Sequence, residues 1–174
     1  MLLSDKDIRH EIAKRRMVFS PHLQAGQIGG ASIDLTLDGR FWLFKTGYAN
    51  SHRPVDLDKV SFVDATQELR QKSIVLAPGQ IVLGITKEKI RLPSDIMGRL
   101  EGRSRYARMG LAVHITSALV QPGSDNHQVL EIVNFAPFPV KISEGMRISQ
   151  VVFEYMKSPT SKPYAKYGKV ARRQ

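Results

Sequence analysis

The periodicity of apolar residues changes near residue 33 of this chain. Before it, apolar positions recur at helical spacing, and Ser4 with Asp7 has the pattern of a capping box, which predicts a helix through Arg15. From Ile33 onward apolar and polar residues alternate, as is typical of a half-buried strand. The Asp38–Gly39 dipeptide is a hairpin-turn signal inside this alternation. The opening pattern therefore predicts one helix followed by β-structure.

Short apolar segments separated by proline and glycine turns fill most of the remaining sequence. The predicted strands cover residues 80–86, 96–100, 111–116, 128–135, 140–142 and 147–153. Residues 46–73 have weak and conflicting periodicity, and we expect mostly loop or short strand there. Strands at this spacing favour a mainly β fold, a β-sandwich or distorted barrel. A chain of 174 residues suits one domain with a core, which we expect over residues 1–156.

Charge distinguishes the C-terminal segment from the rest of the sequence. Residues 157–174 contain six Lys or Arg and no acidic residue, so we expect a mobile tail and not a packed element. The whole chain carries a formal net charge of +10 at pH 7. This excess implies an anionic partner, which could be nucleic acid, an acidic membrane or a polyphosphate.

The absence of cysteine excludes several kinds of chemistry. Without cysteine the chain can form neither a disulfide framework nor a thiolate nucleophile, and it lacks the zinc-binding signature of the zinc deaminases. No apolar run approaches the length of a membrane span, and the first residues lack the features of a signal peptide. We therefore expect a soluble, cytoplasmic protein.

The segment from residue 101 to residue 131 carries the candidate chemistry. Arg103, Ser104, Arg105 and Arg108 fall on what we predict to be one short helical turn, and guanidinium groups pair bidentately with phosphate oxygens. Glu131 ends a short apolar strand, where a half-buried carboxylate suits acid/base work. Together these residues point to an enzyme that acts on a phosphorylated small molecule.

Each of these features also has a simpler interpretation. Glu131 could face solvent from its strand, because alternation permits an outward side chain. The three arginines could form a solvated helix face. His114 is better explained as a core or interface histidine than as a metal ligand, because no second ligand has suitable spacing. We therefore predict no protein-held metal site.

Several sequence motifs together resemble the dCTP deaminase family of the trimeric dUTPase superfamily. The matching segments are G-A-S-I-D-L at 30–35, G-R-S-R-Y-A-R-M-G-L at 102–111, V-H-I-T at 113–116, P-G at 122–123, V-L-E at 129–131 and R-I-S-Q-V-V-F-E at 147–154. They span nearly the whole chain. The arginine-serine and L-E motifs are specific in this order and spacing, whereas the G-A-S-I-D-L segment alone would be weak.

The resemblance implies a dUTPase-like (β-clip) fold with an N-terminal helix and a short helix carrying the arginine-serine motif. It also implies a homotrimer with active sites at subunit boundaries, and hydrolytic deamination of dCTP to dUTP and ammonia, a step toward dUMP and dTTP. Glu131 would activate water, with Ser104 and Arg108 beside it. The implied nucleotide contacts are Arg103, Ser104, Arg105, Tyr106, Ala107, Arg108, Val129, Leu130, Glu131, Gln150, Tyr164 and Gln174.

The resemblance also implies cofactors and partners. Mg²⁺ would arrive on the triphosphate of dCTP or dUTP, without zinc, and dTTP is an expected inhibitor. We expect neither a nucleic-acid nor a membrane partner. Two alternatives stay open: a dUTP diphosphatase or an enzyme that performs both steps, and a non-catalytic nucleotide-binding protein. The diphosphatase branch usually ends in a glycine-rich motif, whereas Gly168 is the only glycine in this tail.

Four positions depart from the family pattern. Arg105 stands where the family commonly has a second serine, and Gln121, Ser124 and Asn126 stand where it commonly has Asp, Trp and Gly. Arg105 would add charge near the phosphates. The other three lie around the P-G turn near the sugar and base, so they bear on sugar selectivity and on the level of activity.

Overall fold

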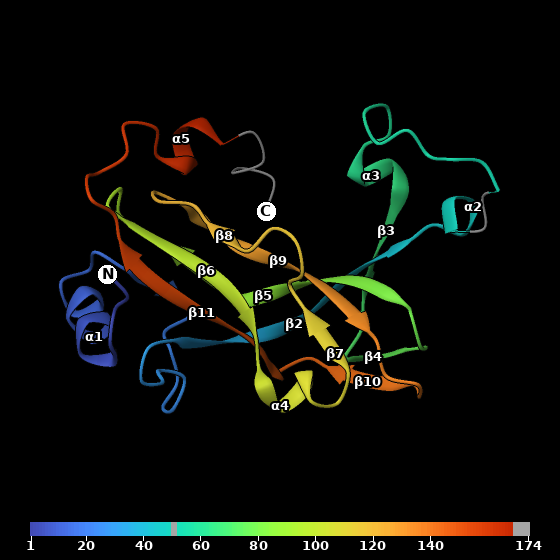
Figure 1. The fold of residues 1–174 in the computed structure, drawn as a ribbon, viewed down its shortest axis with the longest axis horizontal. Coiled ribbons are helices and arrows are strands. Elements are labelled where there is room, and N and C mark those ends of the chain that lie inside the picture. The colour runs from blue at the N-terminus through green and yellow to red at the C-terminus, as the bar shows by residue number, and fades with distance from the viewer. Residues whose placement is uncertain (50–51, 169–174) are drawn as a thin grey trace.

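One large curled sheet forms the body of the protein. The computed structural model describes residues 1–49 and 52–168. Nine strands make this sheet: β1 (Val18–Ser20), β2 (Ile33–Phe44), β3 (Thr66–Arg70), β5 (Ile81–Arg91), β6 (Ile96–Gly102), β7 (Leu111–Val113), β8 (Leu119–Val120), β9 (Asp125–Asn134) and β11 (Arg147–Tyr155). Strands β4 (Ser73–Leu76) and β10 (Val140–Ser143) pair separately. Figure 1 shows these strands crossing the centre of the molecule, with short helices at its periphery.

The sheet curls until its two ends approach each other. Its order is β7-β9-β5-β2-β11-β6-β8, with β1 added to β5 and β3 added to β2. A Cβ at Gly102, the last residue of β6, would lie 3.5 Å from the carbonyl oxygen of Val113 in β7. Helix α4 (Ser104–Ala107) connects β6 to β7 at this point. The predicted mainly β architecture with one short helix at the arginine-serine motif is confirmed.

Strict alternation of buried and half-buried residues explains the central strand. In β2 the side chains of Ile33, Leu35, Leu37 and Phe41 are fully buried and Gly39 is buried with them, whereas the residues that alternate with these are partly exposed. Successive side chains of a strand point to opposite faces, so one face of β2 lines the core. Burial of such side chains contributes roughly 1.5–3 kcal/mol each.

The predicted hairpin turn at Asp38–Gly39 is wrong, because β2 runs straight through it. At this point β2 exchanges neighbours: Thr36 pairs with β11, whereas Arg40 pairs with β3. Gly39 is needed for close approach and not for a turn, since a Cβ there would lie 3.0 Å from the carbonyl oxygen of Gln71. Pairing along both edges of the strand overrides the local turn signal.

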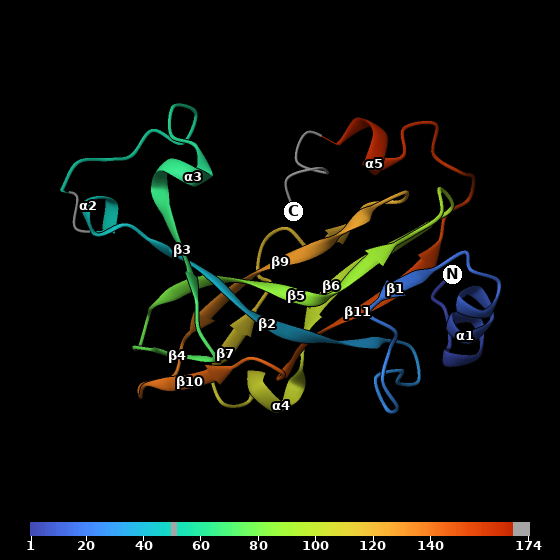
Figure 2. The ribbon, with the colours of Figure 1, turned by 180° about the vertical axis from the view of Figure 1, so that it is seen from behind.

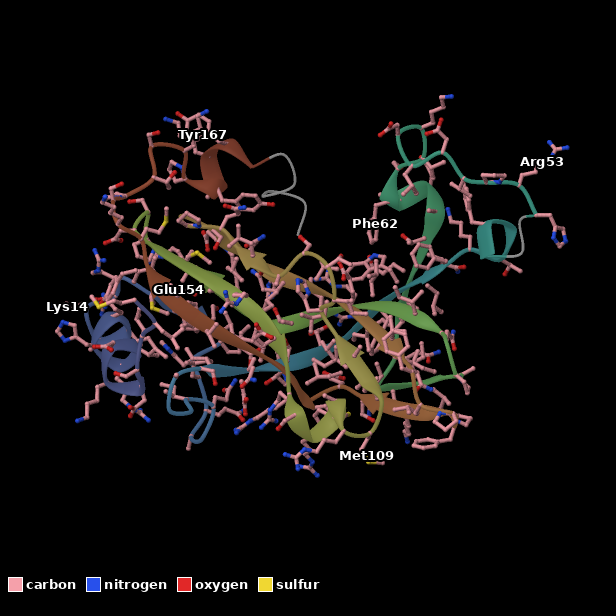
Figure 3. All side chains as sticks on the ribbon, viewed as in Figure 1. Lys14, Arg53, Phe62, Met109, Glu154 and Tyr167 are labelled. Atoms are coloured by element: carbon pink, nitrogen blue, oxygen red, sulfur yellow. The ribbon has the colours of Figure 1, made fainter. Side chains whose placement is uncertain are left out.

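The segment 46–73, predicted as loop or short strand, contains two short helices and the strand β3, and it ends at the first residue of β4. Helices α2 (Thr46–Ala49) and α3 (Phe62–Ala65) form an arm at the end of the molecule opposite the N-terminal helix (Figures 1 and 2). Phe62 of this arm, labelled in Figure 3, packs against Trp42 with ring centroids 6.0 Å apart. Strands β1 and β8 were not predicted, since segments of three and two residues are too short for a periodic signal.

The predicted N-terminal helix is confirmed as α1 (Asp5–Ala13), two residues shorter than expected. Ser4 and Asp7 form both hydrogen bonds of the capping box. On the inner side of the helix, Glu11 is 5% exposed and accepts hydrogen bonds from the Tyr155 hydroxyl at 3.0 Å and from Arg16 Nε at 2.6 Å. This buried carboxylate attaches α1 to β11.

The prediction of an unpacked tail is wrong for residues 157–168. Helix α5 (Tyr164–Tyr167) lies against the turn before β9, where Tyr164 N donates to the Pro122 carbonyl at 3.0 Å and Ala165 N donates to the Gly123 carbonyl at 2.9 Å. Gly123 has φ of +73°, and a Cβ there would overlap Pro163. Composition alone predicted a solvated segment, but these backbone hydrogen bonds hold it on the body.

Candidate functional site

The arginine-serine motif lies where the curled sheet nearly closes. Arg103 is the N-cap of α4, so the helix begins at Ser104, and the Arg103 side chain makes no capping hydrogen bond. Ser104, Arg105, Ala107 and Arg108 are exposed. Because α4 is a single turn between two strands of a rigid sheet, the motif has a fixed position at the surface.

A pocket of about 250 Å³ opens beside α4. The following residues line it, and we call it the arginine pocket: Gly26, Gly29, Ser32, Asp34, Arg103, Ser104, Arg105 and Gln150. They come from the loop before β2, from β2 itself, from α4 with its cap, and from β11. The structure thus brings together four predicted site residues, namely Arg103, Ser104, Arg105 and Gln150.

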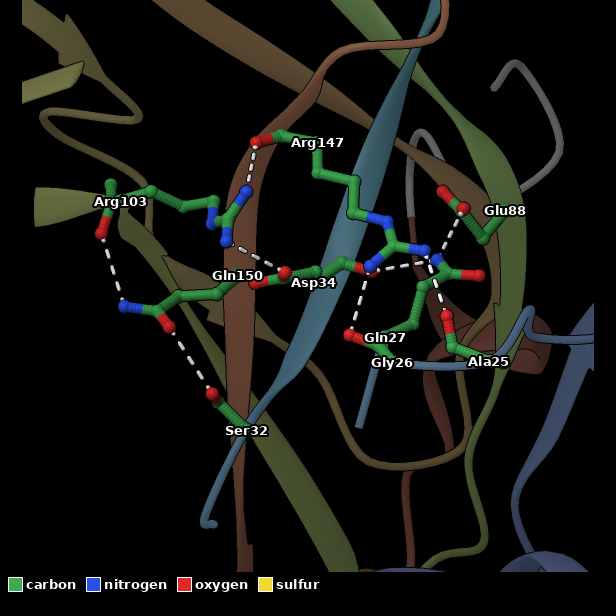
Figure 4. Close-up of polar contacts among 10 residues, drawn as sticks. Ala25, Gly26, Gln27, Ser32, Asp34, Glu88, Arg103, Arg147 and Gln150 are labelled. Carbon is green, nitrogen blue, oxygen red and sulfur yellow. Dashed lines mark hydrogen bonds and ion pairs between the residues drawn. The ribbon is translucent and has the colours of Figure 1, made fainter. Parts of the chain in front are cut away.

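The side chain of Arg103 is anchored within the pocket (Figure 4). Its Nη2 lies 2.9 Å from Asp34 Oδ2, and its Nη1 donates to the Arg147 carbonyl at 2.8 Å. The Arg103 side chain is only 27% exposed. A guanidinium held by two partners loses little conformational freedom when it meets an anion.

Gln150 and Arg147 of β11 attach the neighbouring loops to the pocket (Figure 4). Gln150 donates to the Gly102 carbonyl at 3.1 Å and accepts from the Ser32 hydroxyl at 3.1 Å. Arg147 donates to the carbonyls of Gly26 at 2.9 Å and Ala25 at 3.0 Å. These bonds fix the loop before β2 as one wall of the pocket.

The pocket carries more positive than negative charge. Burial raises the pKa of the Asp34 carboxyl, while the nearby Arg103 and Arg147 guanidiniums oppose that rise. Arg105 stays exposed, with its guanidinium carbon 5.7 Å from the centre of the Tyr106 ring. The lining holds two arginines and one aspartate, and Arg147 lies near that aspartate, so the pocket favours an anionic ligand.

Glu131 lies on β9, and its carboxylate is held by the loop that follows β7. Glu131 Oε2 accepts from Ile115 N at 3.1 Å and Thr116 N at 2.9 Å, and Oε1 accepts from Thr116 Oγ1 at 2.7 Å. We call this arrangement the Glu131 clamp. Glu131 is half-buried, so its carboxylate stays accessible from solvent, but three donors converge on it and fix its position.

The clamp favours the ionised form of Glu131. Partial burial would raise the pKa of the carboxyl, but the hydrogen bonds from Thr116 and Ile115, together with the nearby His114, outweigh it and lower the pKa below its usual value. An ionised carboxylate with fixed geometry can accept a proton from a water molecule at neutral pH.

The residues next to Glu131 differ in their orientation. Leu130 is fully buried in the core, whereas Val129 is half-buried on the face that carries Glu131. A contact between ligand and Leu130 would therefore involve its backbone. Neither Glu131 nor Arg108 lines the arginine pocket, but Arg108 is the C-cap of α4, on the same turn as Ser104 and Arg105, whereas Glu131 lies on β9.

The turn before β9 meets the tail helix. Tyr164 is half-buried against this turn, and burial raises the pKa of its hydroxyl. Ser124 of this turn and Asn126 of β9 are buried at 1% and 3% exposure, whereas Gln121 is exposed. The predicted contact Gln174 lies outside the described residues.

The His114 side chain is half-buried, and one of its two ring nitrogens has a hydrogen-bond partner. Its backbone N–H donates to the Glu131 carbonyl at 2.6 Å and its Nε2 is bonded to the Ser117 carbonyl, while the buried Nδ1 has no partner in the structure. Over residues 1–49 and 52–168, no group of three or more His, Asp or Glu side chains could hold a metal ion. Within the same ranges, no helix is long and apolar enough to cross a membrane.

Sequence reasoning missed several residues of the site. Ser32 and Asp34 fall inside the G-A-S-I-D-L segment and Arg147 begins the last matching segment, but none was assigned a role. Thr116 belongs to the V-H-I-T segment. The motifs marked these positions, but only the folded chain reveals that they contact Arg103, Gln150 or Glu131.

Comparison with known proteins identifies the family. The dCTP deaminase-like family matches residues 2–156. A dCTP deaminase of Rhodospirillum rubrum is 41% identical over 174 residues, covering 95% of this chain and 88% of that protein. A protein of Methanosphaera stadtmanae named "dCTP deaminase, dUMP-forming" is 37% identical over 164 residues, covering 94% of this chain and 83% of its own length.

A solved structure agrees with the fold. The crystal structure of 2′-deoxycytidine 5′-triphosphate deaminase from Agrobacterium tumefaciens matches with a TM-score of 0.68 at 23% identity. The match covers 88% of this chain and 48% of that longer chain, and at this identity it supports the fold alone. The sequence matches and the shared fold lead to one conclusion: the chain belongs to the dCTP deaminase-like family.

Proposed function

We propose that this protein is a hydrolase that deaminates dCTP to dUTP and ammonia. One observation carries the proposal beyond family membership: two backbone amides and a hydroxyl hold Glu131 as a fixed carboxylate of lowered pKa. Such a group can take a proton from the attacking water and deliver it to the pyrimidine ring. Relatives named dCTP deaminase support the choice of substrate.

The arginine pocket is the proposed site of the triphosphate. Arg103, Ser104 and Arg105 would contact phosphate oxygens, and Gln150 would close the pocket from β11. Arg108 is four residues after Ser104, so both can face one ligand from the same helical turn. We assign Ser104 and Arg108 to the water and the base, with Tyr106 and Ala107 completing the turn.

The separation of the two groups of residues supports a homotrimer with shared sites. Glu131 does not line the arginine pocket of its own chain, yet deamination needs the base and the phosphates in one site. Cyclic assembly would bring the Glu131 clamp of one subunit to the arginine pocket of the next. Val129, Leu130 and Tyr164 would then contact the nucleotide from the subunit that supplies Glu131.

Hydrolysis of the product to dUMP is a second candidate activity. It is favoured by relatives named "dCTP deaminase, dUMP-forming", which are 37–38% identical to this chain. The exposed Arg105 beside the pocket would add positive charge where pyrophosphate would leave.

Mg²⁺ and dTTP are the expected metal and effector of this reaction. Mg²⁺ would enter with the triphosphate as part of the substrate, and the lack of cysteine in the whole sequence supports catalysis without zinc. We expect dTTP to compete for the same site, because it shares the triphosphate that the arginine pocket would bind.

Product analysis tests the proposal directly. The protein is incubated with dCTP, and separately with dUTP, in the presence of Mg²⁺ and a zinc chelator, and dUTP, dUMP and pyrophosphate are resolved. Conversion of dCTP to dUTP is expected, and dUMP with pyrophosphate would establish the second activity. Failure to convert dCTP, or activity that needs added zinc, would overturn the proposal.

A further inference from the structure

A buried contact between an amide and a carboxylate lies behind one wall of the arginine pocket. Glu88 of β5 and Gln27 of the loop before β2 are each 3% exposed. Gln27 Nε2 donates to Glu88 Oε1 at 2.8 Å, and Thr36 N donates to Glu88 Oε2 at 2.8 Å. Neither side chain lines the pocket. Figure 4 shows Glu88 and Gln27 next to the groups that do.

Gln27 connects Glu88 to the backbone of the pocket wall. Its Nε2 also donates to the Asp34 carbonyl at 2.8 Å, its Oε1 accepts from Gln24 N at 2.6 Å, and its own carbonyl accepts from Asp34 N at 2.8 Å. Gly26 and Gly29, on either side of Gln27, line the pocket. The position of this wall therefore depends on the orientation of one buried amide.

The contact is an inefficient way to stabilise a core. A buried carboxylate held by neutral donors keeps much of its desolvation cost, and apolar side chains of the same shape are often at least as stable. A carboxylate does, however, fix the direction of the amide that faces it, because only the nitrogen end of Gln27 can donate to it.

We propose that Glu88 and Gln27 are positioning residues for nucleotide binding. They hold the loop of Gly26 and Gly29 at the place where Arg147 binds its carbonyls and where Asp34 anchors Arg103. A shift of this loop would move the guanidinium that meets the phosphates and leave the Glu131 clamp in place. The inference rests on the proposed function, because it assigns the phosphates to the arginine pocket.

The variant Glu88→Gln tests this inference. Its new amide group must face a donor, either Gln27 Nε2 or Thr36 N, so the loop shifts to relieve the conflict. We expect the KM for dCTP to rise about ten-fold with kcat unchanged, because the loss of one buried hydrogen-bond partner weakens binding by about that factor. Competition by inorganic tripolyphosphate should weaken by the same factor, since the loss concerns the phosphates.

The matched control is Glu11→Gln, which changes another buried carboxylate. Glu11 is 5% exposed and lies in α1, which contributes no residue to the arginine pocket. This variant should lower Tm without changing the KM for dCTP. If Glu88→Gln lowers Tm and leaves KM at the Glu11→Gln value, the residue is only structural and the inference is wrong.

Exchange of the two groups gives a second readout. In the double variant Gln27→Glu with Glu88→Gln, an amide again faces a carboxylate, so part of the lost affinity should return. If the loss of affinity in the double variant equals the product of the losses in the two single variants, the inference is wrong. If Glu88→Gln does not fold, Gln27→Met removes the amide at constant length and should raise KM in the same way.

The two proposals fail in different ways. A wild-type protein that does not deaminate dCTP would overturn the proposed function. Calorimetric titration of inorganic tripolyphosphate into wild type and Glu88→Gln would still decide whether this contact positions an anion pocket, since equal affinities would refute it.

Discussion

The arginine pocket and the Glu131 clamp reach fixed geometry by opposite routes. In the pocket, side chains from four separate segments hold one another, and the excess charge is positive. In the clamp, donors from the adjacent Ile115 and Thr116 hold one carboxylate, and the excess charge is negative. The pocket therefore depends on long-range packing, whereas the clamp depends on one short loop. Substitutions in the pocket should therefore change nucleotide affinity, whereas substitutions in the clamp should change the rate of deamination.

The largest expected effect comes from Glu131→Gln. This change keeps the shape of the side chain and removes the proton acceptor, so turnover of dCTP should fall about a hundred- to ten-thousand-fold. Nucleotide affinity, measured by calorimetry, should stay near the wild-type value. The exposed Glu68→Gln on β3 is the matched control and should be fully active. Near-normal turnover of Glu131→Gln would assign the base to another residue.

Mixing two inactive variants tests whether the halves of the site come from different subunits. Glu131→Gln and Ser104→Ala chains, unfolded and reassembled together at equal amounts, should recover about a quarter of wild-type turnover, because one in four subunit boundaries then combines two intact halves. Sedimentation should give a trimer. Absence of recovery in a mixed trimer, or an active monomer, would place both halves in one chain.

Thr116→Val should alter the pH dependence of the reaction. The folded-state pKa of Glu131 is lowered, so the active carboxylate is present above that pKa and is lost as pH falls through it. Removal of the hydroxyl takes away a hydrogen bond to the ionised form, so the acid limb of kcat should move to higher pH. Turnover at neutral pH should fall about ten-fold or less. An unshifted acid limb would show that another group controls it.

The smallest effect is expected from Gly123→Ala, which disturbs the contact with the tail. The added Cβ would overlap Pro163 and displace α5, so the KM for dCTP should rise a few-fold if the tail helps to cover the nucleotide. The control Gly79→Ala has a similar φ of +75° but meets no atom within 4 Å. Both variants should lose about 1 kcal/mol of folding stability, because alanine is strained at a positive φ. Equal KM values in the two variants would make the tail a structural element only.

The sequence predicted those features that depend on local pattern. The alternation from Ile33, the capping box at Ser4 and the short helix at Ser104 all appear in the structure, because each is set by neighbouring residues. The Asp38–Gly39 signal failed because a strand that changes partners at that point also requires a glycine. The tail was misjudged because charge composition carries no information about backbone hydrogen bonds to a distant turn.

The candidate site was predictable as motifs but not as contacts. Arg103, Ser104 and Gln150 were proposed from the resemblance, and the structure brings them into one pocket. The roles of Arg147 and Gln27 could not be predicted from the sequence alone. Arg147 binds the carbonyl of Gly26 and Gln27 binds Glu88, and both partners are more than sixty residues away along the sequence. Such roles come from tertiary structure.

The Glu131 clamp also turns two backbone positions into a spectroscopic probe. The N–H protons of Ile115 and Thr116 point at the carboxylate, so their chemical shifts should follow its protonation. A ¹⁵N-labelled sample titrated with acid would report the ionisation of this one group without any substitution. The same two resonances would respond when a nucleotide or a neighbouring subunit approaches the carboxylate, which makes assembly and binding observable residue by residue.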